Sequence, residues 1–241
     1  MSTITVNELR QHLENEYNGD MIIGFADMRI LPAEARQNAD DKTFDYGIII
    51  GLPFSKEAMI ENNQNLPQKY LAEHIPMNVI LREKLRVAAA NFLEDKGFDA
   101  LTDTPATTFD KASLISQLPQ KTVGTLSGIG WIGKCAMLVT KEFGSALRIT
   151  VLLTNAPLEC GTPITKSLCP QNCTACIGIC PGKSVKNILW EVGIPREKFY
   201  DAHACSKAAL TRAKELLDYD YQICGLCMSH CPFTKKALDY S

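Results

Sequence analysis

The chain has 241 residues, with 25 basic and 27 acidic side chains and a formal net charge of −2 at pH 7. Hydrophobic residues make up 46% and charged residues 22%, as is usual for a folded protein with a sizeable core. These values exclude an intrinsically disordered or collagen-like chain, and the net charge gives no overall attraction to nucleic acid or to an anionic membrane. The length fits one large domain, or one domain with a small module.

The first residues, MSTITVNELR, contain no basic segment followed by an apolar run, so they do not resemble a secretory signal. The longest apolar runs, near Ile48–Phe54 and Ile149–Leu153, are far shorter than the roughly 20 residues that span a bilayer. We therefore expect a cytoplasmic protein without a membrane contact. In a reducing compartment, clustered cysteines indicate metal or redox chemistry more often than disulfides.

The first half of the chain predicts interleaved helices and strands. Thr5 and Glu8 form a capping box at the start of a short helix. Apolar residues at helical spacing predict a long helix from about Met77 to Lys96, which ends at Gly97 in the left-handed C′ position. Strands are expected at Met21–Phe25, Tyr46–Leu52, Met137–Thr140 and Leu147–Thr154, the last two joined by a turn at Phe143–Ser145.

All 10 cysteines lie between Cys135 and Cys231. This shift in composition predicts a domain boundary in the loop Cys160–Leu168. We expect residues 1–160 to form a layered α/β domain and residues 161–241 to form a ferredoxin-like module, which gives an α+β fold class.

The second segment contains two similar cysteine motifs. The first is Cys169-x3-Cys173-x2-Cys176-x3-Cys180-Pro181, and the second is Cys224-x2-Cys227-x3-Cys231-Pro232 with Cys205 upstream. In bacterial ferredoxins the motif is C-x2-C-x2-C-x3-C-P, and its fourth cysteine binds the other cluster. We therefore predict two [4Fe–4S] clusters, one bound by Cys169, Cys173, Cys176 and Cys231, the other by Cys205, Cys224, Cys227 and Cys180. Zinc and disulfides are the alternatives, but neither requires the Cys-Pro ending in both motifs.

Gly128, Gly130 and Gly133 form a G-x-G-x-x-G sequence within TLSGIGWIGKC. A dinucleotide-binding loop of this pattern follows a strand and opens a helix, whereas this one precedes the apolar run AMLVT. A Rossmann fold is therefore disfavoured. Glycines also let a backbone approach a large ligand closely, so a cofactor near this loop is expected.

Several of these features together resemble the epoxyqueuosine reductase family, a relative of the corrinoid reductive dehalogenases. They are the SGIGWIGK segment Ser127–Lys134, the turn Phe143–Ser145, Leu152–Thr154 and the double Cys-Pro module. The resemblance covers about Pro119–Pro232. It implies a short form that lacks the family's C-terminal helical-repeat region, so we expect a substrate other than tRNA.

The resemblance also implies a cobalamin that receives electrons from one cluster. Carried over by position, the candidate cobalamin contacts are Gly128, Gly130, Trp131, Gly133, Lys134, Met137, Thr140 and Thr154. Trp131 is equally typical of a core aromatic residue, and Lys134 of an exposed charge. The acidic residue that the family has upstream of the glycine loop corresponds here to Leu114, with Asp103 and Asp110 nearby but out of register. The catalytic residues are therefore unknown.

We expect a cytoplasmic iron–sulfur oxidoreductase that takes electrons from a ferredoxin or flavodoxin and passes them to cobalamin, which then acts on a small molecule. The alternative is a non-catalytic module that reduces the corrinoid of a partner protein. Two cysteines stand outside the motifs. Cys160 is expected to be a small hydrophobic residue, and Cys135 either the same or a group near a cofactor.

Overall fold

The computed structural model describes residues 3–104 and 109–241. The chain forms two compact units, each assembled from separate stretches of sequence. Unit 1 contains Met1–Leu52, Met77–Ile129 and Arg148–Ile164, and unit 2 contains Pro53–Pro76, Gly130–Leu147 and Thr165–Ser241. The last passage from unit 1 to unit 2, after Ile164, lies in the loop where the sequence indicates a boundary. A functional division at residues 1–160 and 161–241 stays a prediction.

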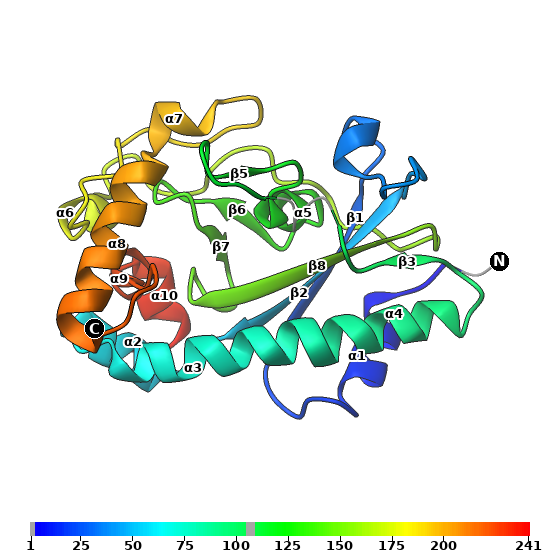
Figure 1. The fold of residues 1–241 in the computed structure, drawn as a ribbon, viewed down its shortest axis with the longest axis horizontal. Coiled ribbons are helices and arrows are strands. Elements are labelled where there is room, and N and C mark those ends of the chain that lie inside the picture. Colours follow the sequence, from blue (N-terminus) through cyan, green and yellow to red (C-terminus); the bar gives the residue numbers. More distant parts are fainter. Residues whose placement is uncertain (1–2, 105–108) are drawn as a thin grey trace. The chain divides into compact units, whose positions relative to one another are not determined.

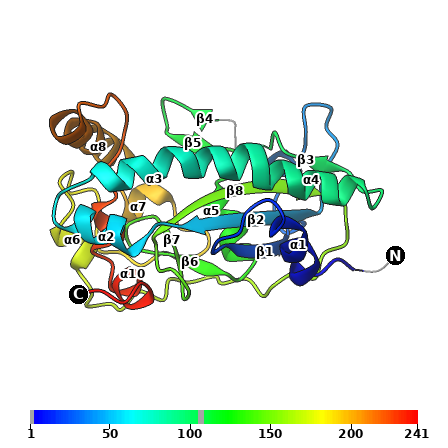
Figure 2. The same ribbon diagram turned by 90° about the horizontal axis from the view of Figure 1, so that it is seen from below.

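Unit 1 is organised around a sheet with the strand order β1-β2-β8-β3. The strands are β1 (Ile22–Asp27), β2 (Tyr46–Pro53), β8 (Leu147–Thr154) and β3 (Ala100–Leu101). β1 pairs antiparallel with β2, and β3 pairs antiparallel with β8. Residues 47–52 of β2 are all buried, as expected for a strand that is covered on both faces. The strands β1, β2 and β8 lie side by side in both views (Figure 1 and Figure 2).

Helices cover both faces of this sheet. α1 (Val6–Leu13) packs against α4 (Arg86–Glu94) and β1, and α5 (Gln120–Leu126) packs against β1. Figure 1 shows α1 and α4 on one side of the sheet and α5 on the other. The predicted capping box is confirmed, because the Thr5 hydroxyl accepts from the Glu8 N–H while the Glu8 carboxylate accepts from the Thr5 N–H.

The prediction of a long helix from about Met77 to Lys96 is confirmed at its C-terminal end and wrong at its N-terminal end. Gly97 has a φ of +82°, which is the predicted left-handed C′ geometry. The helical segment begins with α3 (Gln68–Val79) rather than at Met77, because Pro76 lies inside a helix instead of before one. A π-helical segment, Ile80–Leu85, connects α3 to α4. The remaining short elements of unit 1 are the 3-10 helix Ala33–Ala35 and the strands β4 (Phe109–Asp110) and β5 (Ile115–Ser116).

Unit 2 contains a hairpin and several short helices. β6 (Gly130–Ile132) pairs antiparallel with β7 (Leu138–Thr140). The helices are α2 (Lys56–Asn63), α6 (Ala175–Gly178), α7 (Arg196–Phe199), α8 (Ala202–Leu217), α9 (Leu226–Ser229) and α10 (Pro232–Ala237). The predicted strands at 137–140 and 147–154 exist, and Gly144 makes the turn between them with a φ of +57°. They belong to different sheets, because β7 pairs with β6 while β8 joins β2 and β3.

The two cysteine motifs have similar local structures. α6 lies between Cys173 and Cys180, and α9 lies between Cys224 and Cys231. The two short helices pack against each other, and α9 also contacts α2 and α10. The expected mixture of α and β structure is confirmed. No helix among residues 3–104 and 109–241 combines the length and the apolar character needed to cross a membrane.

Candidate metal centre

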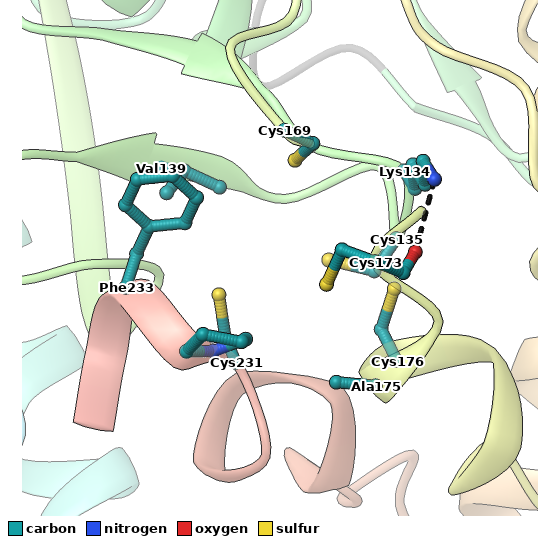
Figure 3. A pocket seen from close by; sticks show the side chains of 11 residues that line it. Lys134, Cys135, Val139, Cys169, Cys173, Ala175, Cys176, Cys231 and Phe233 are labelled. Atoms are coloured by element: carbon teal, nitrogen blue, oxygen red, sulfur yellow. Dashed lines mark hydrogen bonds between the residues drawn. The ribbon is translucent and has the colours of Figure 1, made fainter. Parts of the chain in front are cut away.

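One pocket of unit 2 is lined by five cysteines. They are Cys135, Cys169, Cys173, Cys176 and Cys231. Cys135 comes from the loop between β6 and β7, Cys169 and Cys173 from coil, Cys176 from α6, and Cys231 from the N-cap of α10. Their sulfur atoms face a common space (Figure 3). The fold therefore brings together four residues that the sequence assigns to one cluster, and adds a fifth thiol.

The pocket has an apolar wall that limits the access of water. Val139, Ala175 and Phe233 line it, and the Phe233 ring packs edge-on against buried Trp131 at a centroid distance of 4.9 Å. A Cβ at Gly133 would lie 2.9 Å from a Val139 methyl group, 3.6 Å from the Cys169 sulfur and 3.7 Å from the Cys135 sulfur. Glycine at position 133 therefore keeps the hairpin close to two thiols.

Cys231 is held by the start of α10. Pro232 occupies the first turn of that helix, where the missing proline N–H costs no hydrogen bond. Behind it, the Ser145 N–H donates to the Thr234 hydroxyl at 2.9 Å. A Cβ at Gly144 would lie 2.3 Å from the Thr234 nitrogen, so the turn can lie against α10 only with glycine at this position. The Cys-Pro ending thus fixes the last thiol relative to the hairpin.

The second group of predicted ligands is also brought together in unit 2. Burial raises the pKa of the Cys224 thiol, with further contributions from the nearby Cys205 and Cys180 thiols. The Ser184 N–H lies 3.3 Å from the Cys180 sulfur, an N–H···S contact. Burial and then the Cys205 thiol raise the pKa of the Tyr200 hydroxyl, and Cys227 contributes in the same direction. Cys180 therefore lies with the cysteines of the other motif.

The five thiols surround one shared space. Within the described residues, no three His, Cys, Asp or Glu side chains converge closely enough to hold a single metal ion. Thiolates that each bind a different iron of a cubane need only surround a shared space, as the five cysteines do. Burial raises the pKa of the Cys231 thiol. The donor set of these residues fits an iron–sulfur cluster.

Lys134 supports the loop that carries the first motif. Its side chain is 1% exposed, so it is not the exposed charge that its sequence position also allowed. The ammonium group donates to the carbonyl oxygens of Gln171 at 2.8 Å and Cys173 at 2.9 Å, and to the Asn187 side-chain oxygen at 2.8 Å. The contact with Cys173 is drawn in Figure 3. All three ammonium protons are thereby used within unit 2.

The other candidate cobalamin contacts in unit 2 have internal roles as well. A Cβ at Gly130 would lie 2.3 Å from the Val139 carbonyl oxygen, so this glycine is required by the hairpin itself. The Thr140 hydroxyl accepts from the Phe143 N–H at 3.1 Å and faces the Gly144 carbonyl oxygen at 3.3 Å. Trp131 is 1% exposed, and its indole N–H has no hydrogen-bond partner. The side chain of Met137 is half-buried, and its backbone carbonyl accepts from the Gly133 N–H at 2.9 Å within the hairpin.

The two candidates in unit 1 are likewise explained by local packing. Gly128 follows α5 with a φ of +75°, and a Cβ there would lie 2.5 Å from the Thr162 carbonyl oxygen. The Thr154 hydroxyl donates to the Asp99 carbonyl at 2.7 Å and accepts from the Ala156 N–H at 3.0 Å. These residues have roles in local packing, and their contact with a cobalamin stays a prediction.

The acidic residues near Leu114 do not form a catalytic pair. The Asp110 carboxylate accepts from the N–H groups of Ala112 and Ser113, both at 3.0 Å, and the Ser113 hydroxyl lowers its pKa most. This turn places Leu114 at a φ of +57°, an uncommon geometry for leucine. Asp103 is exposed and interacts electrostatically with Arg86. No proton donor is assigned from these positions.

The two additional cysteines have different surroundings. Cys160 is half-buried in unit 1, where burial raises the pKa of its thiol to about 11. Cys135 is buried in the thiol pocket, beside Cys176 and near Cys227. The sequence offered both a hydrophobic role and a position near a cofactor for Cys135. The structure places it beside four predicted cluster ligands, and its position near a cofactor stays a prediction. Its neighbours could not be read from spacing because they depend on the pairing of β6 with β7.

No protein-family profile matches the chain. Three curated relatives, all named epoxyqueuosine reductase, match part of it. The protein of Listeria monocytogenes is 28% identical over 172 residues, which are 67% of this chain and 39% of the relative. Those of Bacillus subtilis and Atelocyanobacterium thalassa are 29% identical over 164 residues and 41% identical over 128 residues. The Bacillus subtilis match covers 65% of this chain and 37% of that relative. The Atelocyanobacterium thalassa match covers 49% of this chain and 38% of that relative.

Solved structures show the same fold. The catabolic reductive dehalogenase NpRdhA superposes with a TM-score of 0.61 at 16% identity, covering 88% of this chain and 30% of that protein. An epoxyqueuosine reductase solved with a tRNA-Tyr stem loop superposes with a TM-score of 0.56 at 19% identity, covering 95% of this chain and 65% of that protein. The resemblance to epoxyqueuosine reductases is thus confirmed. The chain spans about two fifths of the length of the curated relatives that it matches.

Proposed function

We propose that this chain is an iron–sulfur reductase that carries two [4Fe–4S] clusters in unit 2. Cys169, Cys173, Cys176 and Cys231 would hold one cluster, and Cys205, Cys224, Cys227 and Cys180 the other. The observation that carries the proposal is the position of Cys231, which lines the same pocket as the three cysteines of the first motif. Cys180, close to Cys224, gives the matching observation for the second cluster. The exchange of the fourth ligand is the pattern of two-cluster ferredoxins.

The clusters would supply one-electron transfer, and the described side chains define its surroundings. The apolar wall of Val139, Ala175 and Phe233 excludes water from the first site. Lys134 holds the Cys173 carbonyl and so keeps the ligand loop in place. Cluster potential depends on hydrogen bonds to sulfur and on burial, so the Ser184 N–H near Cys180 tunes the second site.

We further propose that the electrons enter from a ferredoxin or flavodoxin and leave to a cobalamin. The support is the resemblance to epoxyqueuosine reductases and a shared fold with a reductive dehalogenase whose structure has been analysed for B12-dependent dehalogenation. On this proposal Met137, half-buried beside the glycine hairpin, is the residue of unit 2 most available to touch the corrin. The substrate would be a small molecule.

A second function is a non-catalytic module that reduces the corrinoid of a partner protein. One observation favours it: the hydroxyl groups of Thr140 and Thr154 and the ammonium group of Lys134 already have partners inside their own units. The absence of an acid at Leu114 points the same way. The two functions share the clusters and differ in whether this chain itself binds cobalamin.

We also propose that tRNA is not the substrate. The formal net charge of −2 provides no overall attraction to a polyanion. Phosphate contacts make affinity fall steeply with salt, so the test is a titration of a tRNA stem loop at two salt concentrations. Weak binding that does not depend on salt is expected. Sub-micromolar binding with a steep salt slope would restore tRNA as the substrate.

The test of the main proposal is anaerobic reconstitution followed by metal and sulfide analysis and a cobalamin titration. We expect about eight iron atoms and eight acid-labile sulfides per chain, the content of two cubane clusters. Stoichiometric zinc without sulfide would contradict the proposal. In the ultraviolet–visible spectrum of the protein with both clusters, saturable spectral changes on adding cobalamin indicate the corrinoid reductase. Their absence selects the electron-transfer module.

A further inference from the structure

Two basic side chains of unit 2 are almost completely buried. Lys134 is 1% exposed and Arg212 is 6% exposed. Lysine and arginine are almost never buried to this degree without a charged partner, because removing the charge from water is costly. Within the described part of the chain, neither side chain forms an ion pair with a carboxylate. Each buried cation therefore has no carboxylate partner among residues 3–104 and 109–241.

Neutral oxygen atoms accept all the hydrogen bonds of Lys134. They are two backbone carbonyls and one side-chain amide, at 2.8–2.9 Å. One of these carbonyls belongs to Cys173, a predicted ligand of the first cluster. Hydrogen bonds of this kind orient the ammonium group, but they do not neutralise its charge.

Arg212 repeats this arrangement beside the second motif. It donates from Nη1 to the Cys224 carbonyl at 3.3 Å, and from Nη2 to the side-chain oxygens of Asn62 and Asn65 at 3.1 Å each. Its Nε is buried and has no acceptor. The acceptors are again neutral, and one of them belongs to a predicted ligand of the second cluster. Two independent sites thus share one pattern.

We propose that Lys134 and Arg212 are the buried counter-cations of the two clusters, Lys134 for the one on the first motif and Arg212 for the one on the second. This inference rests on the proposed function. A cubane held by four thiolates carries a net negative charge, which grows when the cluster is reduced. A fixed cation nearby favours the reduced form and raises the reduction potential. Lys134 also lines the pocket into which the thiols of the first motif face.

A purely structural role is the competing explanation, and charge distinguishes the two. Lys134→Gln and Arg212→Gln remove the charge and keep a hydrogen-bond donor. Asn187→Gly and Asn65→Gly remove one acceptor of each cation and keep the charge, and glycine suits both positions because Asn187 and Asn65 have φ of +56° and +67°. Arg212→Lys is a second variant that keeps the charge.

The experiment is a redox titration of the reconstituted protein, followed by electron paramagnetic resonance, in all five variants. The glutamine variants should each lower a different one of the two cluster potentials, by at least a tenfold change in the ratio of oxidised to reduced cluster, equivalent to about 59 mV. The glycine variants and Arg212→Lys should shift the same potentials by clearly less.

Unchanged potentials in the glutamine variants, or a shift of the same cluster in both, would overturn the inference. A cluster lost from a glutamine variant supports it only if the charge-retaining variants at the same site keep that cluster. If both kinds of variant lose it, hydrogen bonding rather than charge is responsible and the inference fails. A wild-type protein without iron and sulfide would instead refute the proposed function, so the two failures are distinguishable.

Discussion

In unit 1 the strands β1, β2 and β8 bury a continuous apolar layer, in which Ile48, Ile49 and Ile50 are fully inaccessible. In unit 2 the segment 165–200 contains two four-residue helices, α6 and α7, and otherwise consists of loops. A sheet covered by helices is stable through its own apolar burial. Loops arranged around thiols have little such burial, so this part of unit 2 would depend on the proposed clusters for its stability.

The largest expected effect of this difference is seen on removing iron. Chelation of the reconstituted protein should speed amide hydrogen exchange in residues 165–200 by about tenfold or more, because metal binding and folding are coupled in such segments. Amides of β1 and β2 should keep their protection. Hydrogen exchange with mass spectrometry measures both regions in one sample. Equal loss of protection in both units would contradict the inference that only residues 165–200 depend on the clusters.

A core truncation in unit 1 should lower the stability of the sheet and leave the cluster content of unit 2 unchanged. Ile49→Ala removes a fully buried side chain from β2 and should cost about 2–5 kcal/mol in the free energy of unfolding. Chemical denaturation measures the loss, and iron and sulfide content in native buffer should stay at the wild-type level. If iron content falls in proportion to stability, the two units are not independent in the way we infer.

The glycine hairpin provides a sharper test of what its glycines do. Gly130→Val should destabilise unit 2 by about 1–3 kcal/mol, because its Cβ would meet the Val139 carbonyl oxygen at 2.3 Å. Gly178→Ala is the control, since a Cβ there has nothing within 4 Å. Loss of cobalamin binding in Gly130→Val would therefore not identify a corrin contact. Met137→Glu is the better probe of that contact, and it should leave thermal stability and iron content unchanged.

The smallest expected effect concerns the cap of α1. Thr5→Ala removes the hydroxyl that accepts from the Glu8 N–H and should cost about 1 kcal/mol of stability. Thermal unfolding of the variant should show this loss, while the two cluster potentials stay the same. A shifted potential would mean that a change in unit 1 is transmitted to the cluster sites.

The sequence predicted those parts of the fold, such as helix caps, that depend on contacts between neighbouring residues. The capping box at Thr5 and the C′ glycine at Gly97 each depend on neighbouring residues, and both are present. The start of the long helix was missed because Pro76 is tolerated inside α3. The helix α8, capped by Asp201, was not predicted.

In the candidate site, too, the sequence predicted the features that depend on local spacing and missed those that depend on distant contacts. The grouping of Cys231 with the first motif follows from the ferredoxin spacing, and the pocket is arranged accordingly. The burial and the neighbours of Cys135, Lys134 and Arg212 could not be predicted, because those neighbours come from distant segments. The sequence offered Lys134 as a cobalamin contact or an exposed charge, and gave no sign that Arg212 is buried. Only the packing shows that their hydrogen-bond partners are neutral.

The most direct test of the account is the reciprocal binding of the fourth ligand. Cys180→Ala and Cys231→Ala should be reconstituted, alkylated under native conditions and analysed by mass spectrometry for modified cysteines. In Cys180→Ala we expect Cys205, Cys224 and Cys227 to become reactive, while the first group stays protected. In Cys231→Ala the pattern should reverse, with Cys169, Cys173 and Cys176 modified. If each substitution instead exposes the cysteines of its own motif, the proposed arrangement of the two clusters is wrong.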